Sequence, residues 1–391
     1  MKSPASGGRG TPDFLLLILT LLLVGFGVVM VFSASSSMTV VSPKFGYDAL
    51  YFTKRQVAWA GIGTIAMLVL MNIPFAKFKK WCAPFLLVVL AMLLVVPFTP
   101  SVNGAHSWLG VGGLGIQPTE FAKLGVILYL AAIIAKKEDK FRDFKRGLLP
   151  VMIVIGLIAG LIMLQPDLGS CFILLTCAAA VIIAGGANLK HVLASGGIVV
   201  GIGALAFSAY LLIHPNFSGG YRLARFTAFW DPFADAQGSG LQLLRSLEAF
   251  GHGGLTGAGL GNSVQKLFYL PYAYNDFIFS VIAEELGFIG IMLFLLFLLL
   301  FLWRALIVSL RCSDMFGTLF GVGMVSLISI QALINMGGVS GAIPMTGVTL
   351  PFISYGGSSL LALMIGMGIL LSISREPNRE PREKRAAPPK R

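Results

Sequence analysis

Long apolar runs alternate with short polar segments along most of the chain. A helix needs roughly 17–25 mostly apolar residues to cross a bilayer, and ten runs approach or reach that length. They are Phe14–Phe32, Ala58–Ile73, Cys82–Phe98, Pro118–Ala135, Leu148–Leu164, Gly169–Gly186, Val192–Ile213, Phe277–Trp303, Met315–Met336 and Pro351–Ile373. The pattern predicts an all-α polytopic membrane protein with about ten transmembrane helices, of which the second, third and sixth are the weakest.

The first run allows a second interpretation, as a signal peptide. Ser33-Ala34-Ser35 resembles a small-residue cleavage site. The run exceeds the usual core of about 7–15 apolar residues, and nine further runs follow it. A transmembrane helix is therefore favoured.

The segments between the runs are short, with one exception. A large extracytoplasmic loop, residues 214–276, joins the seventh and eighth runs and contains a short helical pattern at 241–250. A long ordered loop is usually functional, and we expect it to cover a cavity together with the Gly-rich segments 99–117 and 337–349. Residues 14–374 thus form one membrane domain, between a cytoplasmic N-terminus at 1–13 and a basic tail at 375–391 that we expect to be disordered.

Composition supports a membrane protein. Of the 391 residues, 56% are hydrophobic and 12% are charged, whereas soluble domains average about 25% charged residues. The net charge of +12 fits either a nucleic-acid surface or the cytoplasmic rim of a membrane protein. With both termini inside, 21 of the 29 Lys and Arg residues fall in cytoplasmic segments and 7 fall outside. This asymmetry favours a plasma-membrane protein that contacts lipids and binds no nucleic acid. The four cysteines show no metal-binding spacing.

Several charged residues fall within the apolar runs, where a charge is costly and is a candidate for function. Glu120 and Lys123 lie three positions apart, so they share a helical face and can pair. The pair either fixes helix packing or leaves Lys123 facing a polar cavity that receives an anion. Glu284 and Glu285 follow in the eighth run, where we expect one to bond within the bundle and the other to be structural or to join the cavity.

Two aspartates lie at the expected ends of runs. Asp167, in a Gln-Pro-Asp-Leu-Gly turn, is explained by bonding to the backbone of its own turn. Asp276 immediately precedes the eighth run, where it is either a helix N-cap or a carboxylate at the membrane boundary that acts as a general base.

Cations accompany Asp276 in the large loop. Arg222, Arg225 and Lys266 indicate either an anionic ligand such as a phosphate ester or ordinary surface charge. We find no metal cluster, P-loop or Rossmann fingerprint.

Short motifs occur in a definite order along the chain. They are Asn103-Gly104-Ala105-x-x-Trp108, Gln117-Pro118-Thr119-Glu120-x-x-Lys123, Gln165-Pro166-Asp167-Leu168-Gly169, Phe229-Trp230-Asp231-Pro232, Gly257-x-Gly259-x-Gly261-Asn262-Ser263-Val264-Gln265-Lys266, Asp276-Phe277-Ile278-Phe279, Glu284-Glu285-x-Gly287 and Leu350-Pro351-Phe352-x-Ser354-Tyr355-Gly356-Gly357. In this ten-span setting, the chain resembles the SEDS family (shape, elongation, division and sporulation) over about residues 12–375. It is most similar to the division and sporulation members.

The resemblance implies a peptidoglycan glycosyltransferase that polymerises lipid II on the outer face of the cytoplasmic membrane, with a class B penicillin-binding protein as its cross-linking partner. Asp276 matches the essential acidic residue of the family. Glu120 and Lys123 match its polar pair, and Trp108 matches its important tryptophan. Arg222, Arg225 and Lys123 are candidates to bind the leaving pyrophosphate, with Lys266 and Glu285 as further substrate-cavity candidates.

The resemblance leaves some points open. No cofactor is required, and a divalent cation (Mg²⁺ or Mn²⁺) is an option for neutralising the pyrophosphate. The family pattern often has a basic pair where His106-Ser107 stand, and acidic residues at the positions of Phe268 and Tyr272. These departures put in doubt any acidic pair or metal site on that loop. A lipid II flippase and a non-catalytic scaffold for the transpeptidase are the alternative functions.

Overall fold

The structure is a computed structural model, and it describes residues 10–99, 107–110, 115–165, 167–197, 201 and 227–376. Within these ranges the regular structure is helical, apart from an isolated bridge between Leu109 and Ile116. The α helices are α1 (Phe14–Val41), α2 (Tyr51–Met71), α3 (Phe75–Val95), α4 (Pro118–Lys137), α5 (Leu149–Met163), α6 (Leu168–Ala184), α9 (Leu241–Gly253), α10 (Ile278–Leu310), α11 (Met315–Val339) and α12 (Gly357–Ser374).

The helices confirm the all-α membrane fold. Seven of the helical segments, which contain α1, α3, α4, α5, α10, α11 and α12, are long and apolar enough to cross a bilayer. The weak sixth run is the shorter apolar helix α6, and the weak second run overlaps α2, which is not among the seven. The seventh run, Val192–Ile213, lies mostly outside the described residues. Ten crossings therefore stay a prediction.

Many helix boundaries differ from the ends of the apolar runs by several residues, and two of the differences have a clear structural reason. Helix α1 continues beyond Phe32 to Val41, because the hydroxyls of Ser35 and Thr39 bond to carbonyls of the preceding turn and do not interrupt the helix. Helix α12 begins at Gly357 and not at Pro351. The residues between form a turn in which Phe352 has a φ of 65°.

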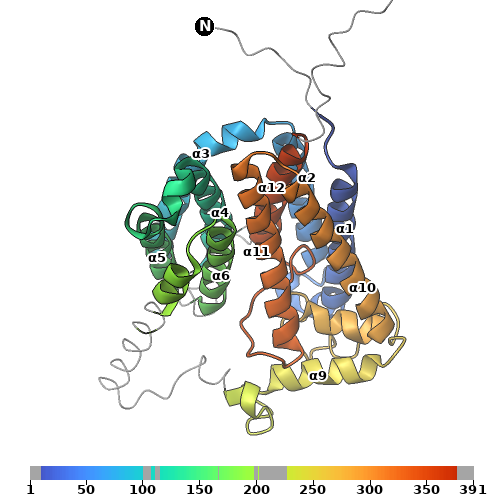
Figure 1. Cartoon of the computed structure of the whole chain (residues 1–391). Coiled ribbons are helices and arrows are strands. Elements are labelled where there is room, and N and C mark those ends of the chain that lie inside the picture. Colours follow the sequence, from blue (N-terminus) through green and yellow to red (C-terminus); the bar gives the residue numbers. More distant parts are fainter. Residues whose placement is uncertain are drawn as a thin grey trace, which may run out of the picture.

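Helix α12 occupies the interior of the bundle and is buried along almost its whole length. It packs against α2, α4, α10 and α11. Figure 1 shows α11 and α12 at the centre, with α3 to α6 on one side and α1, α2 and α10 on the other. Gly368 allows a close backbone approach to α2, since a Cβ there would lie 2.8 Å from the Met67 carbonyl oxygen.

The two ends of the described chain meet at one end of the bundle. Arg375 Nε donates to the Gly10 carbonyl (2.8 Å), and the Asp13 backbone donates to Ser374 Oγ (3.0 Å). Helix α9 crosses the opposite end (Figure 1), which we call the α9 end. The two ends of the described chain lie on the same side of the bundle, which agrees with an even number of membrane crossings between them. That this side is cytoplasmic stays a prediction from the Lys and Arg distribution.

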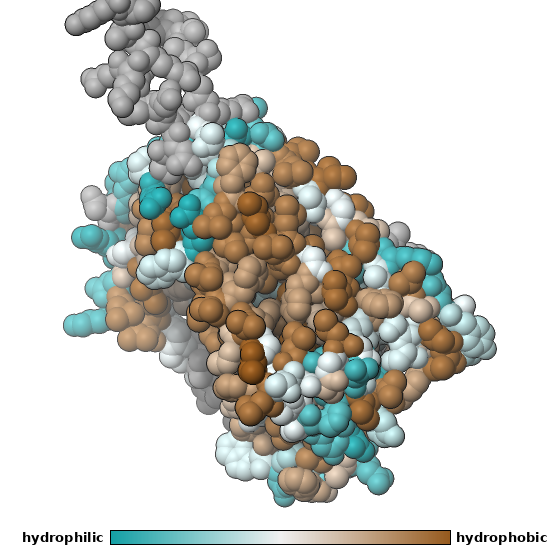
Figure 2. All heavy atoms as spheres, turned by 90° about the vertical axis from the view of Figure 1, so that its right-hand side faces the viewer, coloured by the Kyte–Doolittle hydropathy of each residue, from teal (hydrophilic) through white to brown (hydrophobic). Residues whose placement is uncertain are grey.

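The outer surface has the polarity that a membrane requires. Seen from the α1 and α10 side, apolar side chains cover the middle of the molecule and polar side chains gather towards its lower end (Figure 2). Exposed leucines on these helices include Leu22, Leu293 and Leu299. Lipid contact explains their exposure, because a contiguous exposed apolar surface is typical of a membrane or protein contact.

Helix α10 is broken at Gly287, and hydrogen bonds around this break attach the large loop to the bundle. Gly287 has φ 65° and ψ −169°, a region open almost only to glycine. The carbonyls of Glu284 and Glu285 accept from the loop amides of Ala258 and Gly259, at 2.9 and 3.0 Å. The amides of residues 288 and 289 donate to the carbonyls of residues 254 and 255. The loop thus replaces hydrogen bonds that the kinked helix cannot make.

We predict that Gly287→Ala lowers the thermal unfolding temperature of the detergent-purified protein. A Cβ there would lie 2.2 Å from the Gly257 nitrogen, and the backbone conformation alone costs a non-glycine residue about 1–3 kcal/mol. Gly160→Ala in α5 is the matched control, because its Cβ would meet open space. It should unfold at or above the wild-type temperature. Wild-type stability of Gly287→Ala would contradict this account of the kink.

Candidate active site

Asp276 lies at the α9 end of the bundle, two residues before α10, in a segment whose backbone is tethered from elsewhere. Three consecutive carbonyls accept hydrogen bonds. Tyr274 O accepts from the backbone of Tyr355 (3.0 Å). Asn275 O accepts from Ser354 Oγ (2.7 Å), and Asp276 O accepts from Asn335 Nδ2 (2.8 Å). The donors belong to α11 and to the turn before α12, so the bundle itself sets the position of Asp276.

Asp276 borders a small recess at this end. Gln242 of α9, Asn335 of α11 and Thr346 line it together with Asp276. The Asp276 residue is partly exposed, so its segment is neither sealed in the core nor fully solvated. Gln242 of α9 and residues 345–348 border the recess, and the covering of a cavity by the outer segments stays a prediction.

Aromatic residues pack behind the tethered segment. The Tyr274 ring stacks on Phe52 of α2, with centroids 4.2 Å apart, and Tyr355 packs edge-on against Phe52 at 4.9 Å. Burial, followed by the neighbouring tyrosines and the charge of Asp276, raises the pKa of Tyr274 to about 12. Burial likewise raises the pKa of Tyr355. Both phenols therefore stay protonated near neutral pH.

A line of polar side chains connects this site to the charged pair in α4. Glu120 and Lys123 form the expected ion pair, with Lys123 Nζ 2.8 Å from Glu120 Oε1 and only 2% of Lys123 exposed. Lys123 also donates to Gln331 Oε1 of α11 (3.3 Å), and Gln331 Nε2 donates to the Thr349 carbonyl (3.1 Å). Gln331 and Asn335 are four residues apart on one face of α11. One helix face therefore contacts both the ion pair and the Asp276 segment.

Trp108 lies in a short segment that docks on the start of α12. Its ring covers Gly115, where a Cβ would lie 3.0 Å from a ring carbon. Ser358 Oγ of α12 accepts from the Gln117 backbone (3.0 Å) and donates to the Gly115 carbonyl (3.2 Å). Trp108 is partly buried, and no contact between it and the recess beside Asp276 is among those that the structure describes.

Glu284 and Glu285 are both buried, but they have different partners. Glu284 accepts from the Ser263 hydroxyl and from the Val264 backbone (2.8 Å), and it contacts His252 Nδ1 (2.8 Å). It thus fixes residues 254–266, which we call the Gly-rich loop, to α10. Glu285 pairs with Lys266 Nζ at 2.7 Å. Neither glutamate lines the recess beside Asp276.

The structure describes some of the remaining site candidates and leaves others outside the described residues. Asp167 caps α6 by accepting from the Ser170 backbone (2.9 Å), so the interpretation as a turn residue is correct. Arg222 and Arg225 lie outside the described residues. In the part of the chain that the structure describes, no three His, Cys, Asp or Glu residues gather to hold a metal.

Three contributors to the site were missing from the sequence-based predictions. Asn335 and Ser354 position the Asp276 backbone, and Arg55 of α2 lies over the Tyr51 ring at 4.2 Å and against Tyr355. The contribution of α11 could have been predicted from the sequence, because Gln331 and Asn335 are polar residues at helical spacing in an apolar run. Ser354 lies in a turn, and no sequence pattern identifies its partner.

Comparisons with known proteins agree along nearly the whole chain. The FtsW/RodA/SpoVE family model, described as "Cell cycle protein", matches residues 13–379. Stage V sporulation protein E of Bacillus subtilis is 42% identical over 371 residues, covering 94% of this chain and 98% of the relative. The probable peptidoglycan glycosyltransferase FtsW of the same organism is 44% identical over 372 residues, covering 93% and 90%.

Solved structures share the fold. A chain from a study of how a peptidoglycan synthase complex coordinates polymerization and crosslinking superimposes with a TM-score of 0.73 at 28% identity, covering 94% of this chain and 99% of that chain. The rod shape determining protein RodA of Thermus thermophilus superimposes with a TM-score of 0.65 at 27% identity, covering 93% and 97%.

We predict that Asn335→Leu loosens the Asp276 segment. The substitution leaves the carbonyls of Asp276 and Val348 without their shared donor, at a cost of about 1–3 kcal/mol for each buried group. Hydrogen–deuterium exchange of peptides spanning 270–281 should become faster than in wild type. Ser340→Ala, at an exposed position just after α11, is the control and should not change this exchange. Unchanged exchange in Asn335→Leu would contradict the tether.

Proposed function

This chain belongs to the FtsW/RodA/SpoVE family of cell cycle proteins, and we propose that it is a membrane-embedded peptidoglycan glycosyltransferase. The observation that carries the proposal is Asp276, whose backbone is tethered beside a recess at one end of an all-helical membrane bundle. The names of the FtsW relatives support the reaction type. They favour glycosyl transfer over lipid flipping.

The substrate we propose is lipid II, which serves as both donor and acceptor. The 4-hydroxyl of the acceptor sugar attacks the anomeric carbon of the donor, and a new glycosidic C–O bond forms. The bond from that carbon to the pyrophosphate oxygen breaks, and undecaprenyl pyrophosphate leaves with the electron pair. Asp276 takes the hydroxyl proton, a contribution of typically about 10²–10⁴-fold in rate.

The departing pyrophosphate gains negative charge and needs cations nearby. We propose Lys123, Arg222 and Arg225 for this role, and add Arg55 because it lies beside the tyrosines that pack behind Asp276. An Mg²⁺ or Mn²⁺ ion is an option for the same charge. Magnesium is usually held by few protein ligands together with substrate phosphates, so the pyrophosphate would supply most of its ligands.

Membership of this family also supports proposals for the partner protein, the orientation in the membrane and the biological process. The structure titled as a complex for polymerization and crosslinking supports a transpeptidase partner, which we take to be a class B penicillin-binding protein. We propose that the α9 end faces outward from the cytoplasmic membrane and that both termini are cytoplasmic. Similar identity to a sporulation and a division relative leaves both processes open to this chain.

We predict that Asp276→Asn folds and inserts but loses at least about 10²-fold in polymerisation rate, because the amide cannot accept the proton. The measurement is gel analysis of glycan chains made from labelled lipid II by purified protein with its cognate transpeptidase. Asp48→Asn, an exposed carboxylate between α1 and α2, is the control and should polymerise normally. Glycan formation by Asp276→Asn at near wild-type rate would refute the assignment of the base.

A second experiment separates the packing and chemical roles of the α4 ion pair. Lys123→Met alone leaves Glu120 buried without its cation, which costs about 3–5 kcal/mol. The double variant Lys123→Met/Glu120→Leu removes both charges and should recover most of the thermal stability. We predict that this stable double variant makes no glycan, because Lys123 meets the pyrophosphate. A double variant that is both stable and active would limit the pair to packing.

A further inference from the structure

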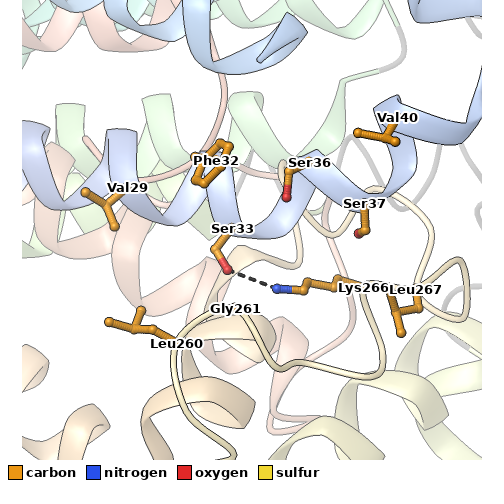
Figure 3. Close-up of a pocket in the computed structure, with 10 residues that line it drawn as sticks. All are labelled: Val29, Phe32, Ser33, Ser36, Ser37, Val40, Leu260, Gly261, Lys266 and Leu267. Carbon is orange, nitrogen blue, oxygen red and sulfur yellow. Dashed lines mark hydrogen bonds between the residues drawn. The ribbon is translucent and has the colours of Figure 1, made fainter. Parts of the chain in front are cut away.

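A cavity of about 530 Å³ lies between α1 and the Gly-rich loop, apart from the recess beside Asp276. Figure 3 shows Ser33, Ser36 and Ser37 of α1 on one side, and Lys266 reaching towards Ser33 from the other. The serines occupy positions i, i+3 and i+4, so they form one polar face on a helix that is otherwise strongly apolar. Val29, Phe32 and Val40 flank that face and are exposed on the lipid side.

The polar wall of the cavity offers hydrogen-bond donors to a ligand. Lys266 Nζ donates to Glu285 Oε1 (2.7 Å) and to Ser33 Oγ (3.1 Å). An ammonium group carries three N–H donors, so one remains for a ligand. The Ser37 hydroxyl is buried and has no hydrogen-bond partner in the structure as described. An amine and two hydroxyls, from Ser36 and Ser37, thus converge on one space.

An apolar groove continues from this cavity between α1 and α10. It measures about 710 Å³ and shares Leu260 with the polar cavity, while Glu285 lies at its polar end. The groove is otherwise lined mainly by apolar side chains, among them Leu22, Phe26 and Leu293. Leu22 and Leu293 are exposed, and apolar side chains cover the middle of the molecule when it is seen from the α1 and α10 side (Figure 2). A polar pocket that leads into an apolar groove matches an amphiphile with a small head.

The cavity is separate from the candidate active site. Gln242 of α9, Asn335 of α11 and Thr346 line the recess beside Asp276, whereas α1 and residues 260–267 line the cavity. The two hollows share no lining residue, and neither Lys266 nor Glu285 lines the recess. A group held by Lys266 therefore lies outside the recess beside Asp276.

We propose that this cavity and groove form a binding site for an anionic membrane phospholipid. Its phosphodiester oxygens accept hydrogen bonds from Lys266, Ser36 and Ser37, and its acyl chains lie in the groove between α1 and α10. Hydrogen bonds from an ammonium group to an anionic oxygen are among the strong ones. The short wall of one amine and a few hydroxyls suits a phosphodiester rather than the disaccharide-pentapeptide of lipid II. Bound lipid would stabilise the contact of α1 with the kinked part of α10.

The test is titration of delipidated, detergent-purified full-length protein with phosphatidylglycerol, followed by native mass spectrometry. We expect Ser36→Ala/Ser37→Ala to weaken binding at least roughly tenfold, because two donors to a charged group are lost. Ser35→Ala is the matched control on the same helix, since its hydroxyl bonds only to the Val31 carbonyl. It should bind as wild type does.

Thermal unfolding provides a second readout that does not depend on catalysis. Phosphatidylglycerol should raise the unfolding temperature of wild type and Ser35→Ala, and have less effect on the double variant. Equal lipid affinity in the double variant and the control would overturn the proposal. So would displacement of phosphatidylglycerol by an equimolar amount of undecaprenyl phosphate, which would make the cavity a site for the polyprenyl lipid.

Discussion

The tether on the Tyr274–Asp276 backbone is the constraint on which the candidate site depends. This segment lies outside any helix, so its carbonyls have no partners from a regular ladder. Asn335, Ser354 and Tyr355 supply them instead. These donors belong to α11 and to the turn before α12, so the bundle itself positions this end of the long loop. The chain therefore presents a carboxylate at a membrane boundary without relying on the loop for its position.

The other buried charges organise the structure around that carboxylate. Glu284 binds the Gly-rich loop, Glu285 pairs with Lys266, and Glu120 pairs with Lys123. An unpaired charge inside a bundle is costly. The two glutamates of α10 have their partners in the loop that precedes it, and Glu120 has its partner one turn along α4. The kink at Gly287 places two of these glutamates where the loop can also bond to the carbonyls of α10. Loop and helix consequently form one rigid unit next to the candidate site.

Much of this arrangement could be predicted from the sequence, because the membrane imposes simple rules. Apolar runs revealed most helices, and the i, i+3 spacing revealed the Glu120–Lys123 pair. Helix ends were less predictable, since the serines of α1 bond within their own helix and let it continue. The separation of Lys266 and Glu285 from the Asp276 recess could not be predicted either, because both residues are placed by contacts with Ser33, more than 200 residues away in the sequence. The tether escaped prediction for the same reason: its donors lie 59 or more residues from their acceptors.

The central claim is that the substrate binds where the tether presents Asp276. A structure of the Asp276→Asn protein bound to lipid II in a lipid nanodisc tests it most directly. The account predicts sugar density in the recess formed by α9, α11 and residues 345–348, with the acceptor hydroxyl within hydrogen-bond distance of residue 276. Sugar density elsewhere, with residue 276 out of contact with the substrate, would contradict it.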